Sequence, residues 1–278
     1  MCAAFRLAAS PAMQLRSLVA PLSLFITVAF AQETPDQKRD TSLSSAKKFK
    51  TKYATTYTIP VVDISAEKER QVIVDREKGQ YLGHPTTLLL EDGKTILCVY
   101  PKGHGRGAIV YKRSADGGKT WSDRLPTPKS WETSLEVPTL HRVVDAQGKK
   151  RVILFSGLYP IRMAVSEDDG ATWSELKPIG KFGGIVTMGS VVALKTPGHY
   201  MALFHDDGRY IIGDEWSGGK AKPGPFWVYQ TRSNDGGLTW STPVPIAHLR
   251  EANLCEPGAV RSPDGNEIAV LLRENSRG

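Results

Sequence analysis

The sequence has few cysteines and no long, clean apolar period of the kind that marks a helix. Only three cysteines occur among 278 residues, and Cys2 falls within the N-terminal segment interpreted below as an export signal. Cys98 and Cys255 permit one disulfide, but both lie in apolar, strand-like contexts that suit buried free thiols equally well. With 26 glycines and 18 prolines, the chain is expected to fold from short strands joined by turns. An all-β fold is therefore predicted.

The sequence also lacks metal-ligand spacing and any concentrated basic patch. No Cys or His pairs stand at the separations typical of metal sites, so no metal and no other cofactor is expected. The formal net charge is +7, but the lysines and arginines are spread along the chain. This spread argues against nucleic acid as a partner, whereas a positive balance favours the attraction of an anionic substrate.

The only long apolar run is at the N-terminus, and it is short for a membrane span. Basic residues precede the apolar stretch 18–30, and Ala29-Phe30-Ala31 supplies the small-x-small pattern that signal peptidase recognises. Residues 1–31 are therefore predicted to be a signal peptide, with Met13 as an alternative start. A membrane anchor is the competing interpretation, but about 13 apolar residues interrupted by proline make a poor span.

Cleavage would leave a secreted or periplasmic protein with no stable membrane insertion. Residues 32–56 are polar, rich in Lys, Ser and Thr, and poor in large apolar side chains. Such a composition cannot form a core, so this segment is predicted to be a flexible leader. Residues 57–278 then form the folded domain.

Three eight-residue segments repeat one pattern of Ser, Asp, Gly, Thr and Trp at fixed offsets. They are 114–121, 166–173 and 233–240, and in each the Trp is followed by Ser. An Asp side chain can accept hydrogen bonds from N–H groups of its own tight turn, and the Gly supplies a conformation that other residues resist. The Trp buries a large surface beside the sheet. Each segment is predicted to be a stiffened hairpin turn, not a catalytic site.

Strand–turn–strand patterns precede and follow these turns. The predicted strand pairs are 86–90 with 95–100, 139–144 with 151–155, 190–194 with 200–204, and 258–260 with 267–272. With a third strand that leads into each repeated turn, a unit has about four strands, as in a propeller blade. The long stretch 205–226 is predicted to be a functional or surface loop.

This arrangement resembles the sialidases, or neuraminidases, in which repeated Ser-x-Asp-x-Gly-x-Thr-Trp segments are called Asp boxes. The resemblance covers residues from about 57 to the end and implies a six-bladed β-propeller, incomplete here at about three and a half blades. Several propellers that are not sialidases also carry this turn, so it is specific for the fold more than for the activity.

The resemblance also suggests catalytic residues. The stretch from Cys255-Glu256-Pro257 to Arg273 is similar to the family's segment that begins with a catalytic Glu and ends, one hairpin later, with an arginine. By that match Glu256 is the base that activates a Tyr nucleophile, and Arg273 belongs to the cluster that holds the sugar carboxylate. The family's third arginine and its tyrosine normally lie in later blades, so this fragment itself is expected to be inactive.

The match in the first unit is weaker. Where the family begins its first inner strand with Arg-Ile-Pro, this chain reads Gly83-His84-Pro85, so the expected arginine is absent. The following loop contains Lys102, His104 and Arg106 but no acid. His104 is a candidate acid/base because its ordinary pKa lies near neutrality. Lys102, Arg106 and His84 are candidate substrate-binding residues.

Other candidates fall near the predicted inner rim of the second and third units. Asp206 is a possible substitute acid because it ends a strand and opens the long loop, and His205 beside it is a candidate for substrate binding. The remaining rim candidates are Glu136, His141, Arg142, Asp207 and Arg209.

Three functions stay open at this point. The leading one is an exported sialidase-like glycoside hydrolase that releases terminal sialic or related acidic sugars from glycans. The second is a carbohydrate-binding propeller without hydrolytic activity, which the missing arginine and the acid-free loop favour. The third is a hydrolase of this fold with its pocket altered for another sugar.

Overall fold

The computed structural model describes residues 2–8, 62–212, 215–216, 219 and 222–275. Within these residues the protein is all-β, with four antiparallel sheets, a two-stranded ribbon and two short 3-10 helices. The helices are η1 (Lys68–Arg70) and η2 (Lys129–Thr133). The predicted all-β fold is confirmed.

The first two of the four antiparallel sheets are built from consecutive hairpins. The first contains β2 (Thr86–Leu89), β3 (Ile96–Pro101) and β4 (Ile109–Ser114). The second contains β5 (Thr139–Val144), β6 (Lys150–Ser156), β7 (Arg162–Ser166) and β8 (Lys177–Pro178).

The third and fourth sheets include the long loop and both ends of the described chain. The third contains β9 (Ile185–Ala193), β10 (Tyr200–Asp206), β13 (Trp227–Ser233) and β14 (Val244–Ala247). The fourth contains β15 (Leu254–Arg261), β16 (Glu267–Glu274) and β1 (Cys2–Ala8). The ribbon of β11 (Ile211–Ile212) and β12 (Glu215–Trp216) lies within the long loop after β10.

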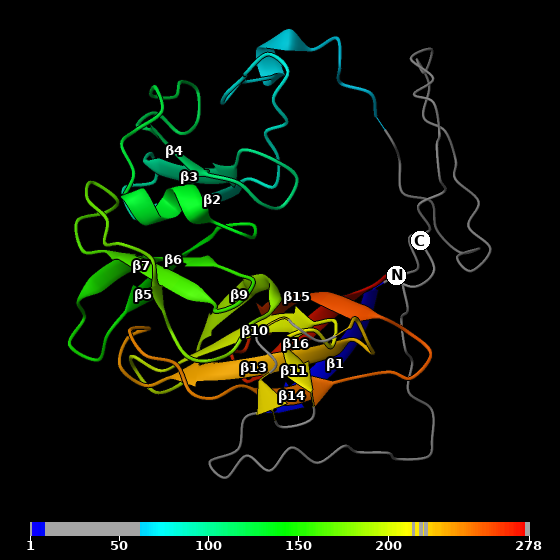
Figure 1. Ribbon diagram of the computed structural model, residues 1–278. Coiled ribbons are helices and arrows are strands. Elements are labelled where there is room, and N and C mark those ends of the chain that lie inside the picture. The colour runs from blue at the N-terminus through cyan, green and yellow to red at the C-terminus, as the bar shows by residue number, and fades with distance from the viewer. Residues whose placement is uncertain (1, 9–61, 213–214, 217–218, 220–221, 276–278) are drawn as a thin grey trace.

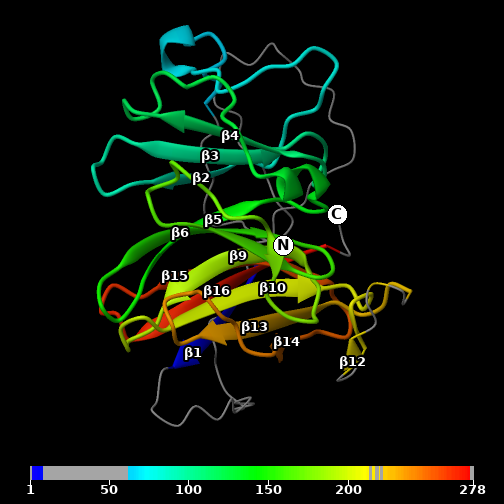
Figure 2. The ribbon, with the colours of Figure 1, turned by 60° about the vertical axis from the view of Figure 1, so that its left-hand side comes forward.

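The sheets follow one another in space in the order of the chain (Figures 1 and 2). The first strand of each sheet contacts the first strand of the next, so β2 is followed by β5, β9 and β15. A hydroxyl donates to a main-chain carbonyl at each of these junctions. The bonds are Thr86 Oγ1 to Pro138 O at 2.9 Å, Thr139 Oγ1 to Thr187 O at 3.0 Å, and Ser190 Oγ to Pro257 O at 3.1 Å. This is the arrangement of blades in a β-propeller.

Apolar side chains fill the space between successive sheets. Trp131 and Tyr111 are buried between the first and second sheets, and Phe155, Phe204 and Trp240 between the second and third. A smaller cluster that includes Leu254 and Leu272 joins the third sheet to the fourth. Burial of such large side chains contributes about 1.5–3 kcal/mol each, so the contacts between sheets dominate the stability of the fold.

The three repeated turns share one hydrogen-bond pattern. In the first, Ser114 Oγ donates to Asp116 Oδ1 at 2.8 Å, and Asp116 accepts from the N–H and the hydroxyl of Thr120 at 2.9 and 2.7 Å. The same bonds recur around Asp168 and Asp235. Hydrogen bonds from the main chain and side chain of Thr120 lower the pKa of Asp116 to about 2. The turns are therefore stiffened as predicted.

Two details of the predicted blades are wrong. The first sheet has three strands, because residues after the first turn run beside β4 with bonds from Ser122 N and Leu125 N but form no strand. Pro126 and Pro128 lie in that segment and have no N–H to extend the pairing. In the third sheet, β9 begins at Ile185, five residues before the predicted start.

The N-terminal strand concerns the predicted signal peptide, and the two cysteines concern the choice between a disulfide and free thiols. Strand β1 pairs with β16 along its whole length, from Cys2 opposite Arg273 to Ala8 opposite Glu267. The rest of the predicted signal peptide and the polar leader 32–56 lie outside the described residues. No helix of the described part is long and apolar enough to cross a membrane. Cys98 and Cys255 are both buried free thiols.

Candidate functional site

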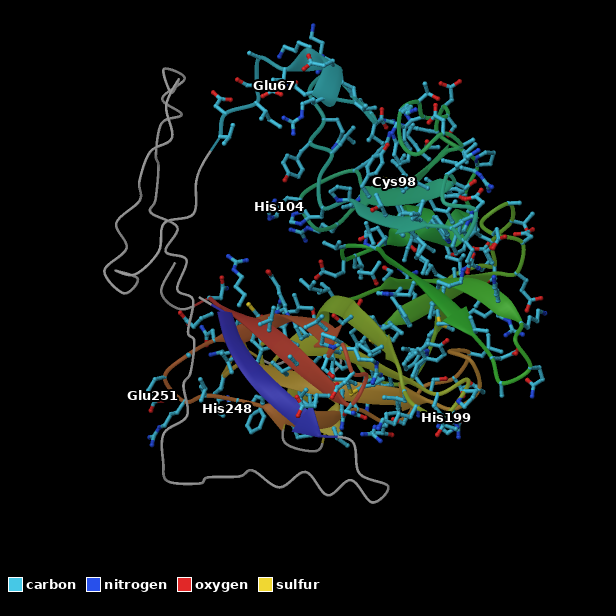
Figure 3. The ribbon with its side chains drawn as sticks, turned by 180° about the vertical axis from the view of Figure 1, so that it is seen from behind. Glu67, Cys98, His104, His199, His248 and Glu251 are labelled. Carbon is cyan, nitrogen blue, oxygen red and sulfur yellow. The ribbon has the colours of Figure 1, made fainter. Side chains whose placement is uncertain are left out.

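The candidate residues gather at one end of the sheets because antiparallel hairpins bring the start of each first strand beside the end of each second strand. His84 precedes β2 and the loop 102–107 follows β3, Glu136 precedes β5, and Glu256 lies near the start of β15. The ends of β10 and β16 bring the residues around Asp206 and Arg273 to the same edge. Figure 3 shows His104 on the side of the first sheet that faces the sheet of β15 and β16.

Glu256 and Arg273 form an ion pair at this edge. Arg273 Nη1 lies 2.8 Å from Glu256 Oε1, and both side chains are exposed. The strand register shifts between Cys255 and Gly258, and Glu256 adopts a φ of 49° in this bulge. Such bulges and left-handed residues re-aim side chains and concentrate at functional sites. The structure thus brings into contact two residues that the resemblance assigned to one site, and their catalytic roles stay a prediction.

His205 is a buried residue that binds the main chain of Glu256. Its Nδ1 accepts a hydrogen bond from the Glu256 N–H at 3.3 Å, and its ring stacks on Phe226 with 5.7 Å between centroids. The side chain is 3% exposed. Burial lowers the pKa of His205 to about 4, with Asp207 acting in the opposite direction and Arg273 in the same direction. The imidazole is therefore neutral at neutral pH, and its place beneath Glu256 suits positioning better than the predicted contact with substrate.

Asp206 and Asp207 have different environments although they are adjacent. Asp206 accepts hydrogen bonds from the N–H groups of Gly208, Tyr210 and Ile211 at 3.0, 3.2 and 3.1 Å. Burial raises the pKa of Asp206, whereas these N–H groups lower it. This carboxylate holds the start of the long loop, which fits a structural role rather than the predicted acid.

Asp207 instead holds an arginine at the rim. Arg209 Nε lies 2.8 Å from both carboxylate oxygens of Asp207, and the guanidinium lies over the Tyr210 ring, 5.4 Å from its centroid. The Asp207 hydrogen bond raises the pKa of Arg209. A second fixed cation therefore accompanies Arg273 in the candidate site.

The loop after β3 presents an imidazole pair. His84 Nε2 and His104 Nδ1 are 3.5 Å apart, and Tyr81 lies beside His104 with 5.7 Å between ring centroids. All three side chains are exposed. Lys102 pairs with Glu77 at 3.2 Å, and Arg106 is exposed. The aromatic neighbour Tyr81 was missed by sequence reasoning, although it stands three residues before His84.

His141 and Arg142 do not join this cluster. His141 Nε2 lies 2.8 Å from the Met188 carbonyl oxygen, and burial lowers the pKa of His141 to about 4. Arg142 pairs with Glu91 at 3.0 Å and with Asp169 at 2.7 Å. Both residues therefore connect strands and turns instead of facing the candidate site, so the prediction that they belong to it is wrong.

A groove in the described part of the protein lies away from the candidate site. A groove of about 560 Å³ lies between β7–β8 and the third repeated turn, where Lys177, Leu238 and Trp240 line it. The repeated turns follow the ends of the third strands, opposite to the edge that carries the candidate site. Among the described residues, no group of three or more His, Cys, Asp or Glu side chains is placed to hold a metal ion.

Comparisons with known proteins support only the fold. No protein-family model matches the chain, and no curated protein matches it significantly. A protein of unknown function from Dyadobacter fermentans is similar in structure, with a TM-score of 0.54 and 15% identity over 74% of this chain and 66% of that one. At this identity the likeness shows a shared fold alone. The chain spans just under two thirds of that protein's length.

Two further structures are less similar. One is a GH43_1 enzyme from Xanthomonas citri complexed with xylotriose, with a TM-score of 0.48 and 11% identity over 67% of this chain and 65% of that one. The other is a xylan β-1,4-xylosidase from Bacillus halodurans, with a TM-score of 0.44 and 18% identity over 72% of this chain and 39% of that one. With TM-scores below 0.5, neither carries an argument about this chain.

Proposed function

We propose that this chain is part of an exported, sialidase-like glycoside hydrolase whose substrates are glycans ending in sialic or related acidic sugars. The observation that carries the proposal is the Glu256–Arg273 pair, held at 2.8 Å at the edge where the first strands of the sheets begin. The three stiffened turns and the blade-like succession of sheets support the resemblance to a six-bladed sialidase propeller.

The chemistry of an acidic sugar suits this set of residues. A guanidinium binds a carboxylate through two parallel hydrogen bonds, and both Arg273 and Arg209 are fixed at the rim by carboxylate partners. A carboxylate nucleophile would be repelled by the sugar's own charge, so the sialidase scheme uses a Tyr activated by a Glu. In this proposal Glu256 is the base that activates the Tyr, and Arg273 binds the carboxylate of the sugar.

Sugar binding by Arg273 is tested by titration calorimetry with methyl α-N-acetylneuraminide. Loss of a hydrogen bond to a charged group costs about 1.5–3 kcal/mol, so Arg273→Gln is expected to weaken binding about 10- to 100-fold. Arg250→Gln removes an exposed arginine from a neighbouring loop and is expected to leave binding unchanged. No binding by the unaltered chain, equal affinity for methyl galactoside, or full affinity of Arg273→Gln would contradict the proposal.

A carbohydrate-binding propeller without hydrolysis is the second candidate. Two observations favour it: the loop 102–107 contains no acid, and Asp206 is held by three main-chain N–H groups. Release of 4-methylumbelliferone from its sialoside, lost in Glu256→Gln, selects the hydrolase and contradicts the inactivity expected of this fragment. Sialoside binding without turnover, unchanged in Glu256→Gln, selects the binding protein.

A further inference from the structure

Glu136 is a buried carboxyl group enclosed by the candidate site. It lies in the segment between η2 and β5, and its side chain is 7% exposed. The glycine-rich loop after β3 passes over it, because a Cβ added to Gly105 would stand 3.6 Å from Glu136 Oε1. On another side, a Cβ at Gly157 would stand 3.0 Å from Glu136 Cβ and Cγ. Gly157 therefore leaves space that this side chain occupies, whereas Gly105 lies at ordinary contact distance from its carboxyl group.

The surroundings of Glu136 favour a protonated carboxyl group. Burial raises the pKa of Glu136, and the charge of Glu256 raises it further, whereas the N–H groups of Val137 and Val186 and the charge of Arg209 lower it. The Val137 N–H donates to Oε1 at 2.8 Å. The main chain therefore fixes the carboxyl group in place, and its Oε1 lies beside Gly105 of the loop that also carries His104.

The other candidate acids are less suited to this task. Asp206 receives three main-chain hydrogen bonds, which stabilise its charged form and hold it in a turn. His104 is exposed at the rim beside His84 and Tyr81. Glu136 alone among these residues combines burial, fixed main-chain contacts and electrostatic contact with both Arg209 and Glu256.

We propose that Glu136 is the proton donor of this site, an inference that rests on the proposed glycosidase function. The Glu136 O–H bond breaks as its proton moves to the glycosidic oxygen, and the C–O bond to the sugar breaks with its electron pair going to that oxygen. Water later supplies the hydroxyl of the released sugar and returns a proton to Glu136. The carboxylate formed in between is stabilised by Arg209 and by the Val137 and Val186 N–H groups.

The first test measures the acid itself. Carbon-13 NMR of protein labelled at the Glu carboxyl carbon is recorded from pH 3 to 9 for the unaltered chain and for Glu136→Gln. The titration curve that disappears in Glu136→Gln is expected to have its midpoint above the ordinary value of 4.5. Glu132→Gln, which removes an exposed Glu four residues earlier, serves as the matched control. A midpoint at or below 4.5 would overturn the proton-donor role.

The second test asks whether that proton reaches a bound sugar. Affinity for methyl α-N-acetylneuraminide is expected to fall by about 2- to 10-fold in total as the pH rises through the Glu136 midpoint, because one hydrogen bond to the glycosidic oxygen is then lost. Glu136→Gln keeps an N–H donor and should bind with no such decline, whereas Glu132→Gln should decline like the unaltered chain. An identical decline in Glu136→Gln overturns the inference. Absence of binding at every pH contradicts the proposed function instead.

Discussion

At the scale of single residues, the candidate site depends on side chains that hold one another in place. His205 accepts the Glu256 N–H within the bulge, and this bond requires an unprotonated Nδ1. Protonation of His205 Nδ1 would therefore remove its bond to the Glu256 N–H, and Glu256 in turn pairs with Arg273.

This connection predicts a pH dependence of stability. Burial lowers the folded-state pKa of His205 from 6.5 to about 4, so the unfolded chain binds more protons between these values. The stabilising effect is complete above pH 6.5 and is lost as the pH falls toward 4, up to about 3 kcal/mol. Urea unfolding of His205→Gln, which removes the titration, should show a shallower decline over this range. His199→Gln is the control, and equal slopes in all three proteins would contradict the prediction.

At the scale of elements, the repeated turns share their hydrogen bonds but differ in what packs against them. Gly118 in the first turn has a φ of 87°, and a Cβ there would stand 3.4 Å from Ile96 Cδ1, an ordinary contact distance. Gly170 in the second has a φ of 82°, and a Cβ there would stand 2.4 Å from Tyr111 Oη and 2.8 Å from Leu97 Cδ1. The second turn is therefore also a packing contact between the first and second sheets.

Alanine substitutions separate these two contributions. Gly118→Ala is expected to cost about 1–2 kcal/mol, because the left-handed backbone is strained while the added Cβ meets only ordinary contacts. Gly170→Ala adds overpacking against Tyr111 and Leu97, for about 1–3 kcal/mol more. The free energies of unfolding from urea titrations measure the difference. Equal losses in the two variants would show that the second turn does not bear on the neighbouring sheet.

The sequence was informative about local elements and less so about burial. Strand–turn–strand patterns predicted the hairpins, and the repeated turns predicted their own hydrogen bonds, because both depend on neighbours in the chain. The spacing of Glu256 and Arg273 across one hairpin placed both in one candidate site, whereas their ion pair is a finding of the structure. The roles of His205, Asp206 and Glu136 could not be predicted, since they depend on contacts such as Gly105 over Glu136 that come from distant segments.

At the scale of the whole molecule, the four described sheets follow one another in series, and in the last of them β16 lies between β15 and β1. Strand β1 covers β16 by pairing with it from residue 2 to residue 8. The proposed export of the protein conflicts with this pairing, because cleavage after Ala31 would remove β1 and leave the N–H and C=O groups of β16 unpaired. An exposed edge strand is a template for pairing with another chain.

Removal of the first 31 residues is therefore expected to promote self-association through β16. Light scattering during gel filtration should show dimers or larger species that grow with concentration for a chain beginning at Gln32, and a monomer for the full chain. Leu271, 47% exposed on β16, lies opposite Ala4 of β1, so Leu271→Lys places a charge on the bare edge and should restore the monomer. Val260→Lys alters a residue of similar exposure on the neighbouring β15 and should not. A monomeric chain from Gln32 onward would mean that β16 needs no partner, and N-terminal sequencing of exported protein that begins at Met1 would mean that β1 is retained.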